Sequence, residues 1–294
     1  MKLTYDISAL RPYINWAYFF FAWQVKEQTE RDRLQREAEN LLDQLEGSYH
    51  AYGLFELFDA YSDGDDIVVF RGERIPQSQE KIARIPCLRQ QQGNPPYLCL
   101  SDFLIPLPPI NSRPTFHTHP SSKSSPSLEA SLSSTIGIFA TSVDIGLETD
   151  FDADPYQKMM AQLLADRLAE AAAERMHEQV RKEYWGYAKD EHLAIPDMLV
   201  EKFQGIRPAV GYPSLPDTSL NFVLDDLLGM KQIGIRLTES GAMKPHASVS
   251  GMMFAHPQAR YFSIGKIGED QLRDYARRRG LPIELCRKFL AGNI

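Results

Sequence analysis

The sequence predicts an α+β fold with a largely antiparallel, twisted sheet and flanking helices. Strand-like runs rich in branched and aromatic residues occur at 67–70 and 136–141, and a longer strand-forming region covers 235–267. Helical patterns separate these regions without the strict strand–helix alternation that builds parallel sheets. The 294 residues are 43% hydrophobic and 24% charged, which is ordinary for a soluble globular protein with a sizeable core. We therefore expect a single domain over residues 1–294.

Composition and charge disfavour several classes of protein. A net charge of −7 argues against binding to nucleic acid, where affinity comes largely from neutralising phosphates. Cys87, Cys99 and Cys286 are odd in number and widely spaced, which indicates reduced thiols and neither a disulfide framework nor a zinc site. The N-terminus lacks a signal-peptide pattern, and the apolar run Trp16–Trp23 is too short for a bilayer span of roughly 20 residues. We expect a cytoplasmic protein with no nucleic-acid or membrane partner.

The N-terminal part of the chain is predicted to contain an aromatic segment, a helix and a hairpin. Residues 11–25 are dense in aromatic side chains, which we interpret as a mostly buried anchor segment. Residues 26–46 form a charged amphipathic helix that Gly47 can end. Its buried face is predicted at Leu34, Ala38, Leu41, Leu42 and Leu45. The turn at 63–66 then leads into the strand at 67–70.

Two further strands, at 97–104 and 136–141, enclose a segment rich in serine and proline. This segment, residues 111–134, is predicted to be a mobile loop. It contains His117 and His119, a His-x-His pair that can ligate a metal. No Cys, Asp or Glu lies close by to complete a site, and a Ser-rich tract has no rigid frame to hold ligands. We therefore predict no metal site.

The clearest helix begins at Pro155, because Asp154 can cap the first turn and proline suits the first helical position. Apolar residues recur every three or four positions and mark its buried face. These are Tyr156, Met160, Leu163 or Leu164, Leu168, Ala172, Met176, Val180 and Tyr184. A polar stripe on one side of the helix consists of Asp166, Glu170, His177 and Arg181. On the residues alone, this stripe indicates a solvated face with helical ion pairs.

The C-terminal part of the chain is predicted to contain a helix over 218–228, a group of strands and two final helices. The strands are expected at 235–243, 247–255 and 260–267. Glu269–Arg279 is expected to be a helix that Gly280 ends, and Pro282 opens the last short helix. Strands grouped in this way favour an antiparallel arrangement.

Residues 205–217, between the long helix and these strands, form a stretch that forbids regular structure. Its prolines fix φ and favour extended backbone before them; they are Pro208, Pro213 and Pro216. Gly211 permits a φ that other residues resist. Arg207 offers a rigid fork of donors and Tyr212 a flat ring with a hydroxyl, which together suit a small ligand with a carboxylate and a ring. The alternative is a proline-rich connection whose arginine makes a structural ion pair.

Motifs that are missing from the sequence narrow the function further. No GxGxxG follows a strand, so an ordinary Rossmann methyltransferase or dehydrogenase is disfavoured. The sequence also lacks a Walker A loop and an HExxH helix. It contains no recognisable triad or general-base cluster, and we predict no catalytic side chain.

The motif in the centre of the loop, Arg207-Pro208-Ala209-x-Gly211-Tyr212-Pro213, resembles the S-adenosylmethionine-binding motif of the activation domain of cobalamin-dependent methionine synthase. The resemblance continues upstream in Ala165–Ala171 and Arg181–Ala188. Downstream it continues through Leu237–Met243, Ala247–Gly251, Phe254, His256-Pro257 and Tyr261. It covers nearly the whole chain and is strongest from about Tyr156 onwards. Residues 111–134 stand out as an insertion relative to this family.

The resemblance implies roles for individual residues. It implies that Arg207 pairs with the methionine carboxylate of S-adenosylmethionine. Ala209, Gly211 and Tyr212 would line the adenosine and the sulfonium. The other ligand contacts that it implies are Asn15, Glu170, Glu201, Tyr261 and Phe262.

Two positions depart from the family pattern. Asn15 stands where the family has an acidic residue, and Phe262 stands where the family has the second tyrosine of a pair with Tyr261. The resemblance also places Asp166 and Glu170 against the cobalamin module, which would make them part of a partner interface.

The resemblance implies that the chain supports reductive methylation, the reactivation of cob(II)alamin. S-adenosylmethionine would supply the methyl group, a flavodoxin-like donor the electron, and the chain proximity and orientation. The cobalamin is expected on a separate cobalamin-dependent methionine synthase that lacks its own activation domain. The chain would then be a free-standing activation component of a methyltransferase, with no turnover alone. The alternatives are a non-catalytic module that binds S-adenosylmethionine or a corrinoid protein, and a structural domain retained after gene fission.

Overall fold

The computed structural model describes residues 1–71, 80–107 and 135–294, and contacts within the chain divide it into two compact units. Unit 1 consists of Met1–Glu56, Phe139–Phe203 and Leu224–Gly251. Unit 2 consists of Leu57–Ile138, Gln204–Val223 and Met252–Ile294. The single domain expected over residues 1–294 stays a prediction. The predicted insertion at 111–134, with His117 and His119, lies outside the described residues.

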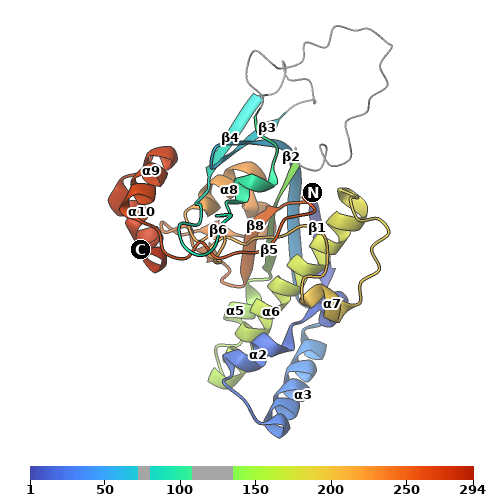
Figure 1. The fold of residues 1–294 in the computed structure, drawn as a ribbon. Coiled ribbons are helices and arrows are strands. Elements are labelled where there is room, and N and C mark those ends of the chain that lie inside the picture. The colour runs from blue at the N-terminus through green and yellow to red at the C-terminus, as the bar shows by residue number, and fades with distance from the viewer. Residues whose placement is uncertain (72–79, 108–134) are drawn as a thin grey trace. The chain divides into compact units, whose positions relative to one another are not determined.

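A largely antiparallel sheet carries the strands of the fold (Figure 1). The strands follow the order β4-β3-β2-β5-β8, and β1 pairs with β2. Their bounds are Lys2–Asp6 (β1), His50–Asp63 (β2), Asp66–Arg71 (β3), Glu80–Pro86 (β4), Thr135–Val143 (β5) and Ser248–Met253 (β8). The pairings β1–β2, β2–β3 and β3–β4 are antiparallel. With its helices, this sheet confirms the predicted α+β fold.

The hairpin between β2 and β3 shows how the local sequence sets the strand register. Asp63 pairs with Asp66, which leaves Gly64 and Asp65 as a two-residue loop. Gly64 has a φ of +61°, a left-handed conformation that glycine adopts readily and that two-residue hairpins favour. The predicted turn at 63–66 and the strand after it are both confirmed.

Unit 1 contains several helices and short turns of helix (Figure 1). They are α1 (Ile7–Leu10), the 3-10 turn η1 (Arg11–Tyr13), α2 (Trp16–Ala22), α3 (Gln28–Leu45), α5 (Gly146–Thr149), α6 (Pro155–Gln179), the π-helical turn η4 (Val180–Tyr184), α7 (Ile195–Leu199) and the 3-10 turn η5 (Met230–Ile233). The helix α8 (Leu220–Leu228) begins in unit 2 and ends in unit 1. The antiparallel pair of β6 (Arg236–Leu237) and β7 (Met243–Lys244) also belongs to unit 1.

The two long helices α3 and α6, which pack against each other, follow the predicted patterns. All predicted core residues of α3 are buried, and Gly47, with a φ of +75°, follows its end. Asp154 caps α6, because its Oδ1 accepts hydrogen bonds from the backbone N of Tyr156 (2.9 Å) and Gln157 (3.3 Å). The buried face of α6 includes Met160, Leu164, Leu168, Ala172 and Met176, and Val180 follows in η4. Tyr156 and Tyr184, at the two ends of the predicted face, are exposed instead. Tyr156 lies in the first turn, and Tyr184 lies in η4, whose π-helical geometry changes the helical phase.

The prediction that most aromatic rings of residues 11–25 are buried is wrong. Tyr13 and Phe19 are fully buried, whereas Tyr18 and Phe21 are 62% and 81% exposed. The cause is the short length of α2, whose seven residues make about two turns. Only one face of so short a helix packs against α6, and the opposite rings remain on the surface.

The strand predicted at 97–104 is also wrong. The chain there forms a loop followed by the 3-10 turn η2 (Leu100–Phe103). The Asp102 carboxylate accepts a hydrogen bond from the Cys99 N–H at 2.8 Å. Such a side-chain bond to nearby backbone competes with strand pairing, which explains the difference.

The strand-forming region 235–267 is only partly confirmed. The strand at 247–255 appears as β8, whereas 235–243 contributes only β6 and the first residue of β7. Residues 260–267 form no strand. Their backbone bonds to irregular segments instead, since the Ile264 N–H donates to the Pro213 carbonyl at 2.9 Å.

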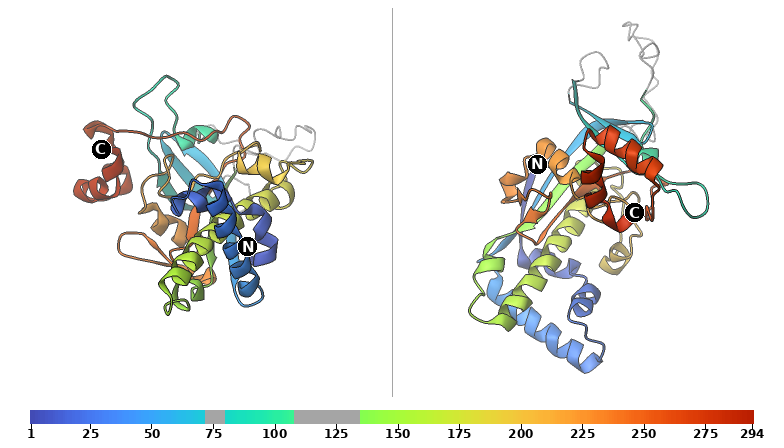
Figure 2. Two further views of the ribbon diagram at one scale, coloured as in Figure 1. Left: turned by 90° about the horizontal axis from the view of Figure 1, so that it is seen from below. Right: turned by 90° about the vertical axis from the view of Figure 1, so that its left-hand side faces the viewer.

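Unit 2 ends in two helices that follow the predicted pattern. They are α9 (Glu269–Arg279), which Gly280 ends with a φ of +65°, and α10 (Ile283–Phe289); the 3-10 turn η6 (Ala291–Asn293) follows. Figure 2 shows α9 and α10 side by side. The hydrophobic cluster with which they pack contains Leu88, Ile264, Ile267, Leu272, Tyr275, Ala276, Cys286 and Leu290. Among the helices of the described ranges, none combines the length and the apolar content that a membrane span needs.

Candidate functional site

The first half of the loop at residues 205–217, which lies in unit 2, is anchored to the end of β8. Ile206 and Phe254 exchange backbone hydrogen bonds of 3.0 and 2.9 Å. The Met252 N–H donates to the Pro208 carbonyl at 3.1 Å. Residues 205–210 are consequently buried. The loop forms neither helix nor strand, as its prolines and glycines predict.

The tip of the loop is a tight turn that presents Tyr212 to solvent. The Gly211 N–H donates to the Leu215 carbonyl, and the Leu215 N–H donates to the Tyr212 carbonyl, both at 2.8 Å. Gly211 has a φ of +88°, while an added Cβ would meet only the Thr218 Cγ2 at 3.7 Å. Backbone conformation, not space, therefore requires glycine here. The Tyr212 side chain is 51% exposed, so part of its ring faces solvent.

Arg207 and Tyr261 meet beneath this turn. Arg207 is only 9% exposed, and its backbone N–H donates to the Tyr261 hydroxyl at 2.9 Å. Phe262 is held beside them on the same chain segment. Its N–H donates to the Ser214 Oγ at 3.3 Å, and its ring lies edge-on to the Phe103 ring with centroids 6.4 Å apart. Six of the predicted residues thus lie on this loop and the segment bound to it: Arg207, Ala209, Gly211, Tyr212, Tyr261 and Phe262.

A buried polar network that sequence reasoning missed holds the end of the loop. Asp217 is 1% exposed, and its Oδ2 accepts a hydrogen bond from the Tyr275 hydroxyl of α9 at 2.7 Å. The Arg279 Nε lies 3.5 Å from the same oxygen, and the Arg279 Nη2 donates to the Ser219 Oγ at 2.7 Å. Burial, with Asp217 nearby, raises the pKa of Tyr275 well above its ordinary value. The tyrosine therefore stays protonated as a donor to the carboxylate.

The remaining predicted ligand contacts, Asn15, Glu170 and Glu201, belong to unit 1. Asn15 is the N-cap of α2, because its Oδ1 accepts a hydrogen bond from the Ala17 N–H at 3.2 Å. Glu201 follows α7 with a φ of +61°, a left-handed conformation that is uncommon outside glycine. Backbone strain of this kind is concentrated at functional sites. Nothing in the sequence around Glu201 predicts this left-handed conformation.

The N-terminal half of the polar stripe on α6 lies partly at the surface. The Asp166 side chain is 29% exposed, and its Oδ1 lies 3.5 Å from the Nδ1 of the exposed His246. Burial raises the pKa of Asp166, and the attraction of His246 only partly opposes this. Glu170, one turn further along, is half-buried. These are the two side chains predicted to face a partner.

The C-terminal half of the stripe corrects the prediction of a solvated face. His177 and Arg181 are completely buried. The Arg181 guanidinium makes a bidentate pair with Glu191, at 3.0 and 2.6 Å, and lies 4.1 Å from the centroid of the Phe203 ring. The segment after η4 therefore covers this part of the helix. Helical spacing identified which residues share a side but not which segment packs against it.

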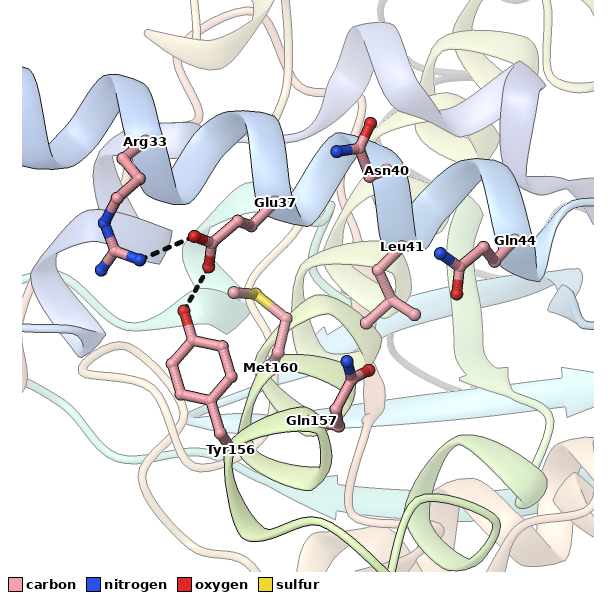
Figure 3. A pocket seen from close by; sticks show the side chains of 8 residues that line it. All are labelled: Arg33, Glu37, Asn40, Leu41, Gln44, Tyr156, Gln157 and Met160. Atoms are coloured by element: carbon pink, nitrogen blue, oxygen red, sulfur yellow. Dashed lines mark hydrogen bonds and ion pairs between the residues drawn. The ribbon is translucent and has the colours of Figure 1, made fainter.

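A pocket of about 380 Å³ opens between α3 and the beginning of α6 in unit 1 (Figure 3). The Glu37 carboxylate bridges its walls, bonded to Arg33 at 2.6 Å and to the Tyr156 hydroxyl. The other lining residues are Asn40, Leu41, Gln44, Gln157 and Met160. None of the predicted site residues lines this pocket, and its two charged side chains pair with each other.

Over residues 1–71, 80–107 and 135–294, no three His, Cys, Asp or Glu side chains are grouped so as to hold a metal ion. The His-x-His pair at His117 and His119 falls outside these ranges.

Comparison with known proteins identifies the family. A family model described as "Vitamin B12 dependent methionine synthase, activation domain" matches residues 6–280. A solved structure titled "Crystal Structure of the MetH Reactivation Domain bound to AdoHcy" is similar, with a TM-score of 0.86 and 35% sequence identity. The match covers 100% of this chain and 90% of that one. The chain belongs to the family of activation domains of vitamin B12-dependent methionine synthase.

Proposed function

We propose that the loop at 205–217 binds S-adenosylmethionine and that the chain thereby supports reductive methylation of cobalamin in methionine synthase. The observation that carries this proposal is the similarity, over the whole chain, to a reactivation domain bound to AdoHcy. The geometry of the loop supports it. A rigid turn presents a half-exposed aromatic ring at Tyr212, and a largely buried guanidinium at Arg207 lies on the same loop. These groups suit the ring and the carboxylate of the ligand.

In this proposal Arg207 pairs with the methionine carboxylate, and the Ala209 backbone, Gly211 and Tyr212 line the adenosine and the sulfonium. The family pattern also assigns ligand contacts to Asn15, Glu170, Glu201, Tyr261 and Phe262. The Tyr261 hydroxyl already accepts a bond from the Arg207 N–H, so it would hold the loop backbone in place. Phe262 has no hydroxyl and instead contributes its ring to the cluster around Phe103.

The chemistry that this assigns to the chain is positioning. The cobalamin is a substrate carried by methionine synthase, S-adenosylmethionine supplies the methyl group, and a flavodoxin-like donor supplies the electron. The chain needs no nucleophile or general base of its own, because holding the reactants close together and correctly oriented lowers much of the activation barrier of such a transfer. The cobalamin would be carried by a cobalamin-dependent methionine synthase, for which this chain acts as the activation component.

Calorimetric titration with S-adenosylmethionine and S-adenosylhomocysteine tests the ligand. Both are expected to bind saturably and to raise the melting temperature, since a ligand that binds only the native state stabilises it. Adenosine should bind more weakly, because it lacks the carboxylate assigned to Arg207. Absence of saturable binding for both S-adenosylmethionine and S-adenosylhomocysteine would refute the proposed ligand.

Substitutions of the two carboxylates Asp166 and Glu170 on α6 test the proposed partner interface. Asp166→Asn combined with Glu170→Gln should slow reactivation of an oxidised cobalamin-carrying methionine synthase by about tenfold, because charges at a docking surface mainly govern association. Reactivation is followed as methylcobalamin formed with S-adenosylmethionine and a reductant. Stability should change by less than about 0.5 kcal/mol, as is usual for surface substitutions. Glu39→Gln, which neutralises an exposed carboxylate on α3, is the control and should reactivate normally. Normal reactivation by the double variant would show that this face binds no partner.

The helix cap at Asn15 gives a separate test of the ligand contact that the family pattern assigns there. Asn15→Asp keeps an oxygen to cap α2, so stability should hold, whereas Asn15→Ala should cost about 1 kcal/mol. If the side chain also reaches the ligand, aspartate adds a charge-assisted contact and tightens S-adenosylmethionine binding by about 1 kcal/mol. Urea unfolding and calorimetry report the two effects separately. Unchanged affinity in Asn15→Asp, with the cap intact, would reduce Asn15 to a structural role.

A binding module without methyl transfer is the second candidate, favoured by Phe262 and Asn15, which depart from the family pattern. This candidate predicts the same saturable binding of S-adenosylmethionine as the first, but no reactivation of cobalamin. Saturable binding of S-adenosylmethionine without any methylcobalamin formed would establish this alternative.

A further inference from the structure

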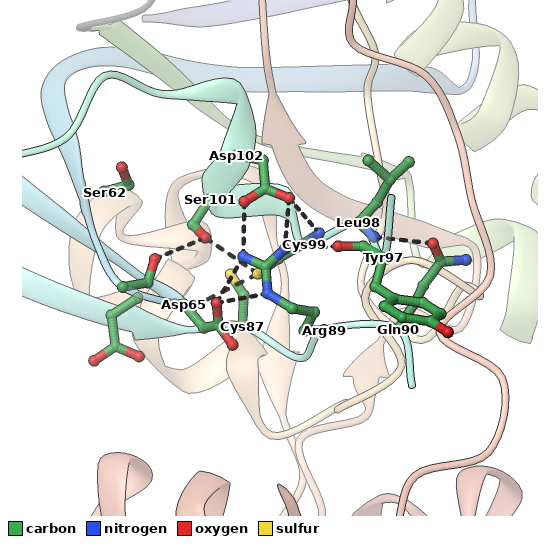
Figure 4. A network of polar contacts seen from close by, with 12 residues as sticks. Ser62, Asp65, Cys87, Arg89, Gln90, Tyr97, Leu98, Cys99, Ser101 and Asp102 are labelled. Carbon is green, nitrogen blue, oxygen red and sulfur yellow. Dashed lines mark hydrogen bonds and ion pairs between the residues drawn. The ribbon is translucent and has the colours of Figure 1, made fainter. Parts of the chain in front are cut away.

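Two of the cysteines lie against each other in unit 2 (Figure 4). Cys87 follows β4 and Cys99 precedes η2, and both are buried. A hydrogen bond links the two thiols. The sequence separates them by a loop and gives no CxxC signal, so only the fold brings them together. Neither thiol is among the residues assigned to the ligand, although Cys87 lines a small cavity with residues 214–217 of the loop.

Hydrogen-bond donors surround the sulfur of Cys99. The Ser101 Oγ donates to it at 3.2 Å, and the Ser101 N–H also donates. The Cys99 S–H itself donates to the Asp65 carbonyl at 3.8 Å, and the Cys87 S–H donates to the Ile85 carbonyl at 3.6 Å. Burial alone would raise the pKa of Cys99, but its interactions with Cys87 and Ser101 lower it below the usual value. The bond to Cys99, followed by burial, raises the pKa of Cys87. The two neighbouring thiols therefore differ in acidity, and the lower pKa makes Cys99 the sulfur expected to react first.

The backbone around the two thiols fixes their contact. Arg89 and Cys99 face each other in an antiparallel bridge, and the Cys87 N–H donates to the Asp65 carbonyl at 2.9 Å. The Arg89 guanidinium holds the two sides together, bonded to Asp65 at 2.7 Å and to Asp102 at 2.7 Å. Figure 4 shows these side chains around the sulfurs. The contact is thus part of a rigid framework and does not depend on one flexible side chain.

Cys286 provides the contrast within the same unit. It is buried in α10. Within the described residues, Cys286 forms no hydrogen bond to another thiol. Burial raises its pKa, so it should react slowly with oxidants.

We propose that Cys87 and Cys99 form a reversible disulfide when a hydroperoxide oxidises Cys99. The Cys99 thiolate attacks the peroxide, an S–O bond forms, the O–O bond breaks, and an alcohol or water leaves after protonation. The Cys87 sulfur then attacks the sulfenic acid, the S–S bond forms, and the hydroxyl leaves with the Cys87 proton as water. The two sulfurs give two electrons to one peroxide. This inference does not depend on the proposed ligand.

The segment between the two cysteines provides access for a small oxidant. Residues 91–97, which connect them, are exposed irregular backbone. Exposed loops of this kind open locally at far lower cost than the whole domain unfolds. A hydroperoxide is small enough to enter during such openings, so oxidation should be slow compared with that of a surface thiol but complete.

Thiol counting after treatment with hydrogen peroxide tests the proposal. The full chain is reduced, freed of reductant and oxidised, and its remaining thiols are alkylated with N-ethylmaleimide in denaturant and counted by intact mass. The wild type should fall from three alkylated thiols to one and return to three with dithiothreitol. Cys286→Ser is the matched control and should fall from two to none. Peptide mapping should find a peptide linked through Cys87 and Cys99.

The variants separate the two steps of the reaction. In Cys87→Ser no disulfide can form, and dimedone should trap a sulfenic acid at Cys99; in Cys99→Ser, Cys87 should stay alkylatable. Alanine replacements repeat the test if a serine variant fails to fold. The proposal is overturned if the wild type keeps three alkylatable thiols in excess peroxide, if Cys286 joins the linked peptide, or if Cys99 proceeds to a sulfinic acid that dithiothreitol does not reverse.

Discussion

Replacing Arg207 by alanine is expected to weaken binding of S-adenosylmethionine by about ten- to a hundredfold. A charge-assisted bidentate bond to a carboxylate contributes roughly 1.5–3 kcal/mol. Arg207 is only 9% exposed, so water cannot readily replace the lost bonds. The loop should keep its course, because the contact of residue 207 with Tyr261 is made by the backbone N–H. Calorimetry gives the affinity, and the melting temperature without ligand checks the fold.

Two further variants locate the effect. Arg207→Lys keeps the charge but loses the planar fork, so its affinity should fall between those of the wild type and the alanine variant. Arg260→Ala removes an exposed arginine from the segment next to Tyr261 and should bind normally. If Arg207→Ala binds as tightly as the wild type, the arginine is a structural residue of a proline-rich connection and the ligand is held elsewhere.

Replacing Asp217 by alanine is expected to destabilise the protein by about 3–5 kcal/mol. The change would leave the buried Arg279 without its carboxylate, and uncompensated buried charges have costs of this size. It would also free the Tyr275 hydroxyl from its bond to the end of the loop. The affinity for S-adenosylmethionine should fall as well, because residues 214–217 lose their attachment to α9. Urea unfolding measures the first effect and calorimetry the second.

Asp66 supplies the matched control for Asp217. It is equally buried and pairs with Arg278, the residue before Arg279 in α9, and with Arg84 of β4. Asp66→Ala should therefore destabilise the protein by a similar amount, but its network bonds to β4 and not to the loop. Its ligand affinity at a temperature where the protein stays folded should remain normal. Equal losses of affinity in both variants would show that Asp217 acts only through global stability.

The parts of the fold that the sequence predicted correctly are those that local signals determine. Asp154 caps α6 and Gly280 ends α9, because each needs only its neighbours in the chain. The apolar spacing of α3 identified its buried residues for the same reason. The motif around Arg207 indicated the family from the sequence alone, because the prolines and glycines that make this loop rigid are themselves part of the motif.

The errors arise where a distant segment decides the structure. Helical spacing placed His177 and Arg181 on one side of α6, but Glu191 and Phe203 bury them. Residues 260–267 resemble a strand, yet their partner is the irregular loop that ends near Asp217. Asp217 itself carries no signal, because a single aspartate after a proline is ordinary in a turn. Its importance comes from Tyr275 and Arg279, which lie far along the chain.

The adjacent arginines of α9 limit how the length of this helix can change. A helix turns by about 100° per residue, so Arg278 and Arg279 point in different directions and reach two separate aspartates, Asp66 and Asp217. One residue inserted between Tyr275 and Arg278 would rotate both guanidiniums away from their partners at once, whereas an insertion after Gly280 would leave both in place. An insertion near the end of α9, natural or engineered, should therefore be tolerated after Gly280 and not between Tyr275 and Arg278.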